Sequence, residues 1–249
     1  MGASNQNGEA APFDHGEASE ACERFDQSSQ KFRDLVTEVS NSFVERLDAI
    51  LDIDEPLLRS AENEESFATI TDIVAAGKHL EHFHSYQRIH DTGSASVEEP
   101  HTIDYHTDQG LFIAFTPAHV IDEVKDEPTN GAGEFFIQFQ DGSAMAADFS
   151  SDELIFMLGD GVNQYVNKKC QSGPPLRATP HALRMPSQSA SEFRLWFGRM
   201  VLPPGKCDCP PLVFHNSASF HLKGDVLVRR KRYQRRARSL VRHASRARD

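Results

Sequence analysis

Two histidines and one aspartate have types and spacing that suit a mononuclear metal site. His106 and Asp108 are two positions apart, at i and i+2, so on extended backbone their side chains project to the same side and can chelate one ion. A lone His-x-Asp pair means little in a chain with 12 histidines, so an independent third ligand is needed. His181 supplies it from far downstream, after several expected strands. Two imidazoles and one carboxylate form the facial triad that holds Fe(II) and leaves coordination positions open.

The segments that must position these ligands are predicted to be mainly short strands. Turn chemistry separates them, such as the Asp141-Gly142 dipeptide that favours tight hairpins. Many short strands with such turns indicate a sandwich or a barrel. The expected strands cover residues 68–74, 79–87, 111–116, 134–140, 144–149, 154–158 and 193–202.

One amphipathic helix is predicted before the strands, over residues 32–51. Its apolar residues recur at three- and four-residue steps, the helical period. They are Phe32, Leu35, Val36, Val39, Phe43, Leu47 and Leu51. We expect this helix to brace the barrel.

Composition divides the chain into three parts. Residues 1–27 are polar, with too little apolar surface to offset the entropy of ordering, so we expect disorder there. Residues 28–222 are long enough for one domain, with the barrel core at about 66–204. Residues 223–249 form a basic tail; from residue 229 onward it holds ten Lys or Arg and one acid, whereas the whole chain has a net charge of -11. The tail is therefore expected to contact an anionic partner, or to remain solvated.

The expected compartment is intracellular, cytoplasmic, or nuclear through the basic tail. The four cysteines are few and poorly spaced for structural bridges, which favours a reducing setting. No apolar run approaches the roughly 20 residues of a membrane span, and the first residues lack the pattern of a secretory signal. Cys207 and Cys209 with two later histidines form an alternative zinc site, but their CxC spacing departs from the usual CxxC.

Four motifs agree in chain order with one known family. His106-Thr107-Asp108 is followed by GLFI at residues 110–113, and FFIQFQDG at residues 135–142 reads as a hairpin. MLGDGVNQYVN at residues 157–167 and PHAL at residues 180–183 follow. Together they resemble the isopenicillin N synthase-like, 2-oxoglutarate/Fe(II)-dependent dioxygenases, over roughly half of the chain.

The resemblance implies a mainly β fold, a double-stranded β-helix barrel of the jelly-roll or cupin-like kind with flanking N-terminal helices. It implies His106, Asp108 and His181 as iron ligands. It also places Arg194 on the 5-carboxylate of 2-oxoglutarate, and Tyr86 near the cosubstrate. The family's Arg-x-Ser reads Arg194-Leu-Trp196 here, so a hydroxyl is missing and Trp196 narrows the pocket instead.

Arg199 is a second candidate for the same carboxylate. Alternation along a strand predicts that Arg194, Trp196 and Gly198 face the iron, whereas Arg199 faces the other way. Both arginines therefore cannot point inward on a regular strand.

The resemblance implies an oxidoreductase that uses Fe(II), dioxygen and 2-oxoglutarate, releases succinate and CO2, and hydroxylates or otherwise oxidises a substrate. Two alternatives stay open: a catalytically silent double-stranded β-helix that binds a ligand, or an Fe(II)/O2 oxidase that does not use 2-oxoglutarate. Asp160 is interpreted as a turn residue. The histidine-rich patch formed by His79, His82, His84 and His90 is interpreted as a polar strand face.

Overall fold

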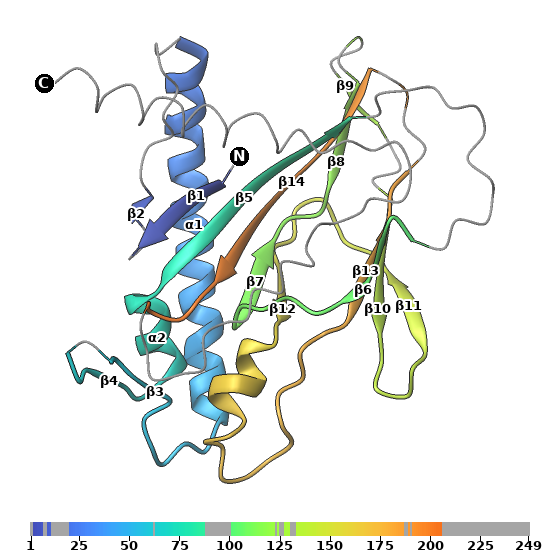
Figure 1. Cartoon of the computed structure of the whole chain (residues 1–249). Coiled ribbons are helices and arrows are strands. Elements are labelled where there is room, and N and C mark those ends of the chain that lie inside the picture. Colours follow the sequence, from blue (N-terminus) through green and yellow to red (C-terminus); the bar gives the residue numbers. More distant parts are fainter. Residues whose placement is uncertain are drawn as a thin grey trace, which may run out of the picture.

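Two antiparallel sheets face each other in this computed structural model (Figure 1), which describes residues 2–6, 9–10, 20–61, 63–87, 101–122, 124, 127–129, 133–186, 189 and 191–205. The larger sheet has the core order β12 (Ile155–Leu158), β7 (Phe112–Phe115), β14 (Glu192–Val201), β5 (Lys78–Gln87). The smaller sheet has the order β11 (Ala144–Ala147), β10 (Glu134–Gln138), β13 (His181–Arg184), β6 (Ile103–His106).

The chain crosses repeatedly between these two sheets. It passes from β5 to β6, back to β7, across to β10 and β11, back to β12, across to β13 and finally to β14. Antiparallel strands that alternate in this way between two facing sheets form a jelly roll. The predicted mainly β, double-stranded β-helix fold is therefore confirmed.

Further short strands extend the larger sheet or form a separate ribbon. β8 (His119–Asp122) pairs with the first half of β14 and with β9 (Glu127–Thr129). β1 (Gly2–Gln6) pairs with β5, and β2 (Glu9–Ala10) pairs with β1. A separate two-stranded ribbon joins β3 (Leu58–Arg59) and β4 (Ser66–Phe67).

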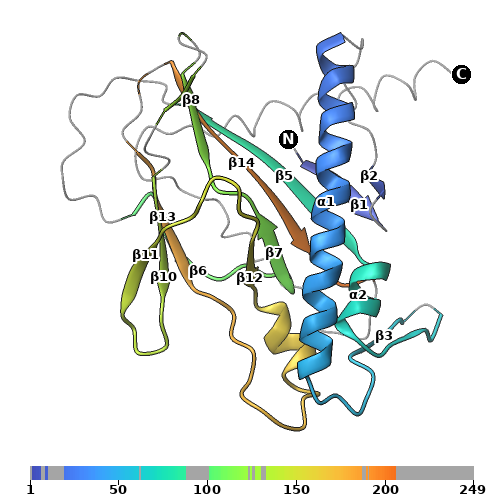
Figure 2. The same cartoon turned by 180° about the vertical axis from the view of Figure 1, so that it is seen from behind.

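The helix α1 (Glu20–Ile50) packs along the outer face of the larger sheet, away from the smaller one (Figure 2). Val36 on its apolar stripe is fully buried against Ala114 of β7 and Phe197 of β14. The helix therefore braces the barrel, as expected.

The expectation of disorder over residues 1–27 was wrong in part. The helix begins at Glu20, twelve residues before the start of the expected stripe. Its first turns are not purely solvated, because the Phe25 ring meets that of Phe83 edge-on, with centroids 5.6 Å apart. β1 forms by main-chain pairing with the edge of β5, which requires no apolar side chains and so leaves no compositional signal.

Residues 68–74 were expected as a strand but form most of the helix α2 (Ile70–Ala76). Their β-branched residues favour a strand, yet Thr69 and Asp72 make a reciprocal capping box at the helix start. Asp48 of α1 also accepts hydrogen bonds from the amides of Ile70 and Thr71. These local polar contacts override the strand propensity.

The remaining expected strands appear as β5, β7, β10, β11, β12 and β14, with ends shifted by up to a few residues. A short π-helix, η1 (Val162–Val166), follows β12. The main core lies between α1, α2, η1 and the larger sheet, around Phe112, Ile70, Ile73 and Val166. Among the described helices, none combines the length and apolarity needed to cross a membrane.

Candidate metal centre

The three expected ligands come together at one end of the smaller sheet. His106 is the last residue of β6, Asp108 follows two residues later, and His181 is the first residue of β13. The antiparallel register puts His106 opposite His181, with ring centroids 4.2 Å apart. One ligand atom from each of the three side chains lies within 4.8 Å of the others. Across the described ranges, no other group of three such side chains is gathered in this way.

Backbone carbonyls orient both imidazoles. The Nδ1 of His106 lies 2.9 Å from the carbonyl oxygen of Asp104, and the Nδ1 of His181 lies 3.0 Å from that of Thr179. A carbonyl only accepts, so Nδ1 is the donor in both rings, and in a neutral imidazole the lone pair is then on Nε2. This outer hydrogen bond is the usual support of a metal-binding histidine. The donor set and its orientation therefore fit a metal ion.

His181 is the most enclosed of the three ligands. Its side chain is buried, and the ring of Phe135 from β10 stacks on it with centroids 5.2 Å apart. Burial lowers the pKa of His181, although Asp108 acts in the opposite direction. Burial thus favours the neutral imidazole, which is the form that can donate its lone pair to a metal.

The two arginines of β14 occupy opposite faces of the larger sheet. Trp196, two residues from Arg194, packs against the interior cluster of Ile113, Phe115 and Met157, which also includes Phe135. Phe197 instead packs under α1. Neighbouring residues of β14 therefore alternate between the two faces of the sheet, as a regular strand requires.

Arg194 is buried on the interior face. It pairs in register with Tyr86 of β5, which is also buried. Burial lowers the pKa of the Arg194 guanidinium to about 10, and Tyr86 partly offsets this. The guanidinium therefore stays charged at neutral pH, inside a poorly solvated region.

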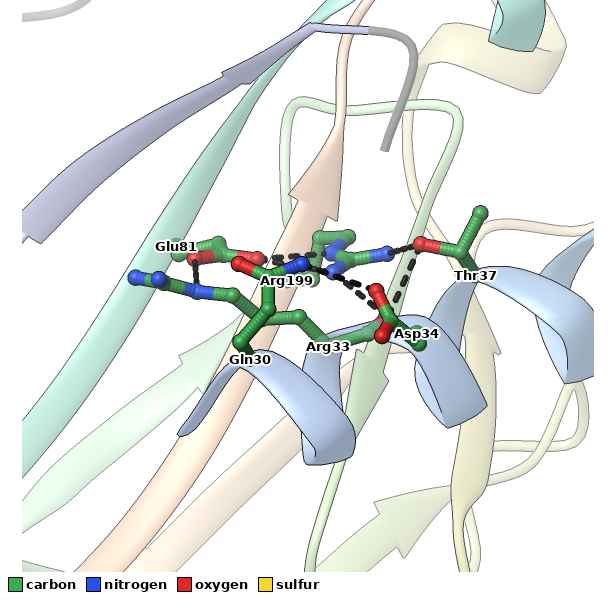
Figure 3. Close-up of polar contacts among 6 residues, drawn as sticks. All are labelled: Gln30, Arg33, Asp34, Thr37, Glu81 and Arg199. Atoms are coloured by element: carbon green, nitrogen blue, oxygen red, sulfur yellow. Dashed lines mark hydrogen bonds and ion pairs between the residues drawn. The ribbon is translucent and has the colours of Figure 1, made fainter. Parts of the chain in front are cut away.

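Arg199 is engaged on the outer face, as Figure 3 shows. Its Nη2 lies 2.8 Å from Oε1 of Glu81, and its Nη1 donates to Oγ1 of Thr37 over 2.7 Å. Arg33 of α1 binds the other Glu81 oxygen at 2.7 Å. Glu81 is fully buried and both arginines are nearly so. This cluster ties α1 to β5 and β14 and commits Arg199 to the scaffold.

Trp196 and the histidines of β5 form an aromatic stack on the interior face. The His84 ring lies parallel to the indole of Trp196 with ring centroids 4.4 Å apart, and the rings of Tyr86 and His82 are also stacked with that of His84, at 5.7 Å and 5.2 Å. The Tyr86 hydroxyl also lies 3.3 Å from Nδ1 of His84. The strand face that was expected to be polar is therefore an aromatic part of the barrel interior. The histidines in the sequence did not by themselves predict this.

Other candidates lie apart from the centre. His79 is buried, and its Nε2 bonds to the carbonyl oxygen of Val74 at 3.0 Å, so it joins α2 to β5. His90, Cys207 and Cys209, with the two histidines of the alternative zinc site, lie outside the described residues. So does the basic tail, residues 223–249.

Thr107 and Asp160 were not expected to share a contact. The Thr107 hydroxyl donates to Oδ2 of Asp160 over 2.7 Å, although the two residues are 53 positions apart in the sequence. Asp160 sits in a turn, as interpreted, but its carboxylate reaches the residue between two ligands. Nothing in the spacing of the sequence pointed to this pair.

Comparison with known proteins reveals a shared fold. No protein-family model matches the chain, and no curated protein matches it. A protein from Shewanella oneidensis described as an oxygenase superposes with a TM-score of 0.50, at 12% identity, over 77% of this chain and 60% of its own. At such identity the likeness concerns the fold alone.

Two plant enzymes are also among the similar structures. The dioxygenase for auxin oxidation 1 from Arabidopsis thaliana, in a complex with 2-oxoglutarate, has 16% identity and a TM-score of 0.47 over 76% of this chain and 55% of its own. The rice dioxygenase for auxin oxidation has 12% identity and a TM-score of 0.48 over 98% and 68%. The chain thus spans 55% and 60% of the length of the Arabidopsis and Shewanella proteins.

Proposed function

We propose that this chain is a non-haem Fe(II)- and 2-oxoglutarate-dependent dioxygenase, which hydroxylates or otherwise oxidises a substrate and releases succinate and CO2. The observation that carries the proposal is the cluster of His106, Asp108 and His181 in a jelly roll, with both Nδ1 atoms occupied by carbonyls. Two imidazoles and one carboxylate are typical of a catalytic iron site, because they leave coordination positions open for other ligands. A structural metal site has all its positions filled by the protein.

The three side chains would hold the metal through Nε2 of each histidine and a carboxylate oxygen of Asp108. The carboxylate partly offsets the charge of the cation, which two neutral imidazoles do not. Bound Fe(II) supplies the redox chemistry that couples decarboxylation of 2-oxoglutarate to oxidation of the substrate. The protein's share is to bind, to orient and to exclude water.

Arg194 is assigned to the far carboxylate of 2-oxoglutarate. It is a buried cation on the interior face, and a planar guanidinium can bind a carboxylate through two parallel hydrogen bonds. The fixed engagement of Arg199 with Glu81 favours Arg194 over Arg199 for this role. Tyr86, beside Arg194 on the neighbouring strand, is assigned to the same subsite.

The aromatic interior would limit water around the cosubstrate. Phe135 covers one face of His181, and Trp196 belongs to the same apolar cluster as Phe135. This apolar cluster contains side chains from both sheets and so fills space between the proposed metal ligands and β14. Electrostatic contacts within such an apolar setting are stronger than in water.

One observation favours a second candidate, an Fe(II)/O2 oxidase that does not use 2-oxoglutarate. Trp196 occupies the position at which the resembling family has a serine hydroxyl, and its stack with His84 fills part of the interior. A catalytically silent binding domain is the third arrangement compatible with the fold.

We also infer, from composition alone, that the protein works inside the cell, where its cysteines stay reduced. The basic tail, residues 223–249, would contact an anionic partner there, including a nuclear one. The substrate would be a small molecule or an amino-acid side chain.

Oxygen-dependent succinate formation separates the three functions. Protein loaded with Fe(II) should convert 2-oxoglutarate to succinate only when both oxygen and iron are present, and Asp108→Ala should abolish the conversion. The measurement is succinate by mass spectrometry together with oxygen uptake, across a panel of small-molecule and peptide substrates. Oxygen uptake that does not require 2-oxoglutarate would assign the oxidase, and iron binding with no uptake would assign the binding domain.

A further inference from the structure

We propose that residues 158–161, named here the β12 turn, hold the metal-ligand segments in place, and that Asp160 is a positioning residue that acts through Thr107. This inference rests on the proposed function, because it concerns the same metal centre. It adds two side chains that do not belong to the ligand group itself.

The main chain of the β12 turn binds the loop that carries Asp108. The amide of Asp160 donates to the carbonyl oxygen of Asp108 at 2.6 Å. The amides of Gly159 and Gly161 donate to the carbonyl oxygens of Leu111 and Gly110, each at 3.0 Å. Three successive amides thus fix the loop immediately after the ligand.

The two glycines make this close approach possible. A Cβ atom at Gly159 would clash with the carbonyl oxygens of Gly110 and Asp108, and one at Gly161 would clash with the amide nitrogen of Leu111. The backbones are therefore in direct contact, with no space for a side chain between them.

The Asp160 carboxylate binds the residue that precedes Asp108 in the sequence. It accepts the Thr107 hydroxyl at 2.7 Å, in a half-buried position. Thr107 is the residue between His106 and Asp108, so this bond restricts the backbone that sets the angle between two ligands. A hydrogen bond to a charged acceptor contributes more than a neutral one.

The same turn also reaches the segment that carries His181. The amide of Thr179 donates to the carbonyl oxygen of Leu158 at 3.0 Å. The carbonyl of Thr179 in turn accepts Nδ1 of His181 at 3.0 Å. Because β12 belongs to the larger sheet and β6 and β13 to the smaller one, the β12 turn connects the two sheets beside all three ligands.

The expected consequence is preorganisation of the ligand set. Outer contacts of this kind typically change metal affinity by about 10- to 100-fold when they are removed. Thr107→Val removes the hydroxyl at nearly constant shape, and Asp160→Ala removes its acceptor. Each should weaken metal binding by roughly that factor, and the double variant should be little worse than either single one, because both delete the same bond.

Matched controls separate positioning from general stability. Thr71 donates its hydroxyl to Asp48 at 2.6 Å, which is the same kind of Thr–Asp bond placed between α1 and α2. Thr71→Val should lower thermal stability without changing metal affinity. Thr107→Ser, which keeps the donor, should restore most of the affinity, and Asp160→Asn, which keeps an uncharged acceptor, should restore part of it.

The experiment uses Co(II) as probe, with affinity from chelator competition and geometry from the visible absorption spectrum, beside thermal unfolding. We expect weaker binding and an altered Co(II) spectrum in Thr107→Val and Asp160→Ala only. Affinity and spectrum equal to those of Thr71→Val would overturn the inference while the proposed function stands. A wild-type protein that binds no Co(II) or Fe(II) would overturn both. If Asp160→Ala fails to fold, Thr107→Val and Thr107→Ala decide.

Discussion

Arg194 and Arg199 are both buried on strand β14, but their side chains lie in different surroundings. Arg199 shares Glu81 with Arg33 and donates to Thr37, and its burial lowers its pKa despite the carboxylate. Arg194, five residues earlier, lies on the interior face beside Tyr86. The same side-chain type is thus a scaffold element on one face and a candidate ligand-binding group on the other.

Substitution of the two arginines should separate these roles. Arg194→Leu is expected to weaken 2-oxoglutarate binding by about 100-fold or more, because loss of one partner of a buried ion pair costs roughly 3–5 kcal/mol. Arg199→Leu should instead lower the free energy of unfolding by a similar amount and leave affinity nearly unchanged. Calorimetric titration of anaerobic Fe(II)-loaded protein and chemical unfolding measure both. A larger loss of affinity in Arg199→Leu would reverse the assignment.

At the scale of single residues, the correct predictions came from strand alternation and from residue type and order. Strand alternation correctly separated the faces of Arg194 and Arg199, and residue type and order identified His106, Asp108 and His181 as a possible cluster. The Glu81 ion cluster was not predicted, because the register between β5 and β14 and the position of α1 are set by tertiary packing. The Thr107–Asp160 bond was missed for the same reason.

At the scale of elements, His79 joins α2, β5 and the segment after β14. Its Nε2 donates to the carbonyl of Val74, and its Nδ1 accepts the amide of Leu202 at 3.4 Å. Burial lowers the pKa of His79 from 6.5 to about 4. A proton on Nδ1 would remove the acceptor that Leu202 uses, so the folded chain favours neutral His79.

This joint should make stability depend on pH. The unfolded chain binds the His79 proton near pH 6.5 and the folded chain only near pH 4, so the free energy of unfolding falls as the pH drops through this interval. The full effect is about 3 kcal/mol. In His79→Gln the slope should shrink, whereas exposed His119→Gln should keep it. Urea unfolding at several pH values tests this, and equal slopes in all three proteins would contradict the account.

Element boundaries depended on contacts that local sequence hides. The strands of the barrel were predicted well because alternation and turn residues are local signals. α2 was mistaken for a strand, since its β-branched residues outweighed the capping contacts of Thr69 and Asp48. β1 escaped detection because main-chain pairing to β5 leaves no pattern in its side chains.

At the scale of the molecule, the jelly roll explains why proposed ligands that are far apart in the sequence lie close together. His106 and His181 end up opposite each other because β6 and β13 are neighbours in the smaller sheet. The larger sheet carries Arg194 and the β12 turn, so the proposed site draws on both sheets. The fold was predictable from strand pattern and resemblance, whereas the substrate was not, because neither identifies the residues that would contact it.

The most direct test of the metal centre is the amount of Fe(II) that the whole chain retains under anaerobic conditions. The wild type should bind about one Fe(II) per chain, and His106→Ala, Asp108→Ala and His181→Ala should each lose it sharply while their circular dichroism stays that of the folded barrel. His119→Ala, an exposed histidine of β8, serves as the control and should retain iron. Iron contents equal to the wild type in all three ligand variants would contradict the assignment.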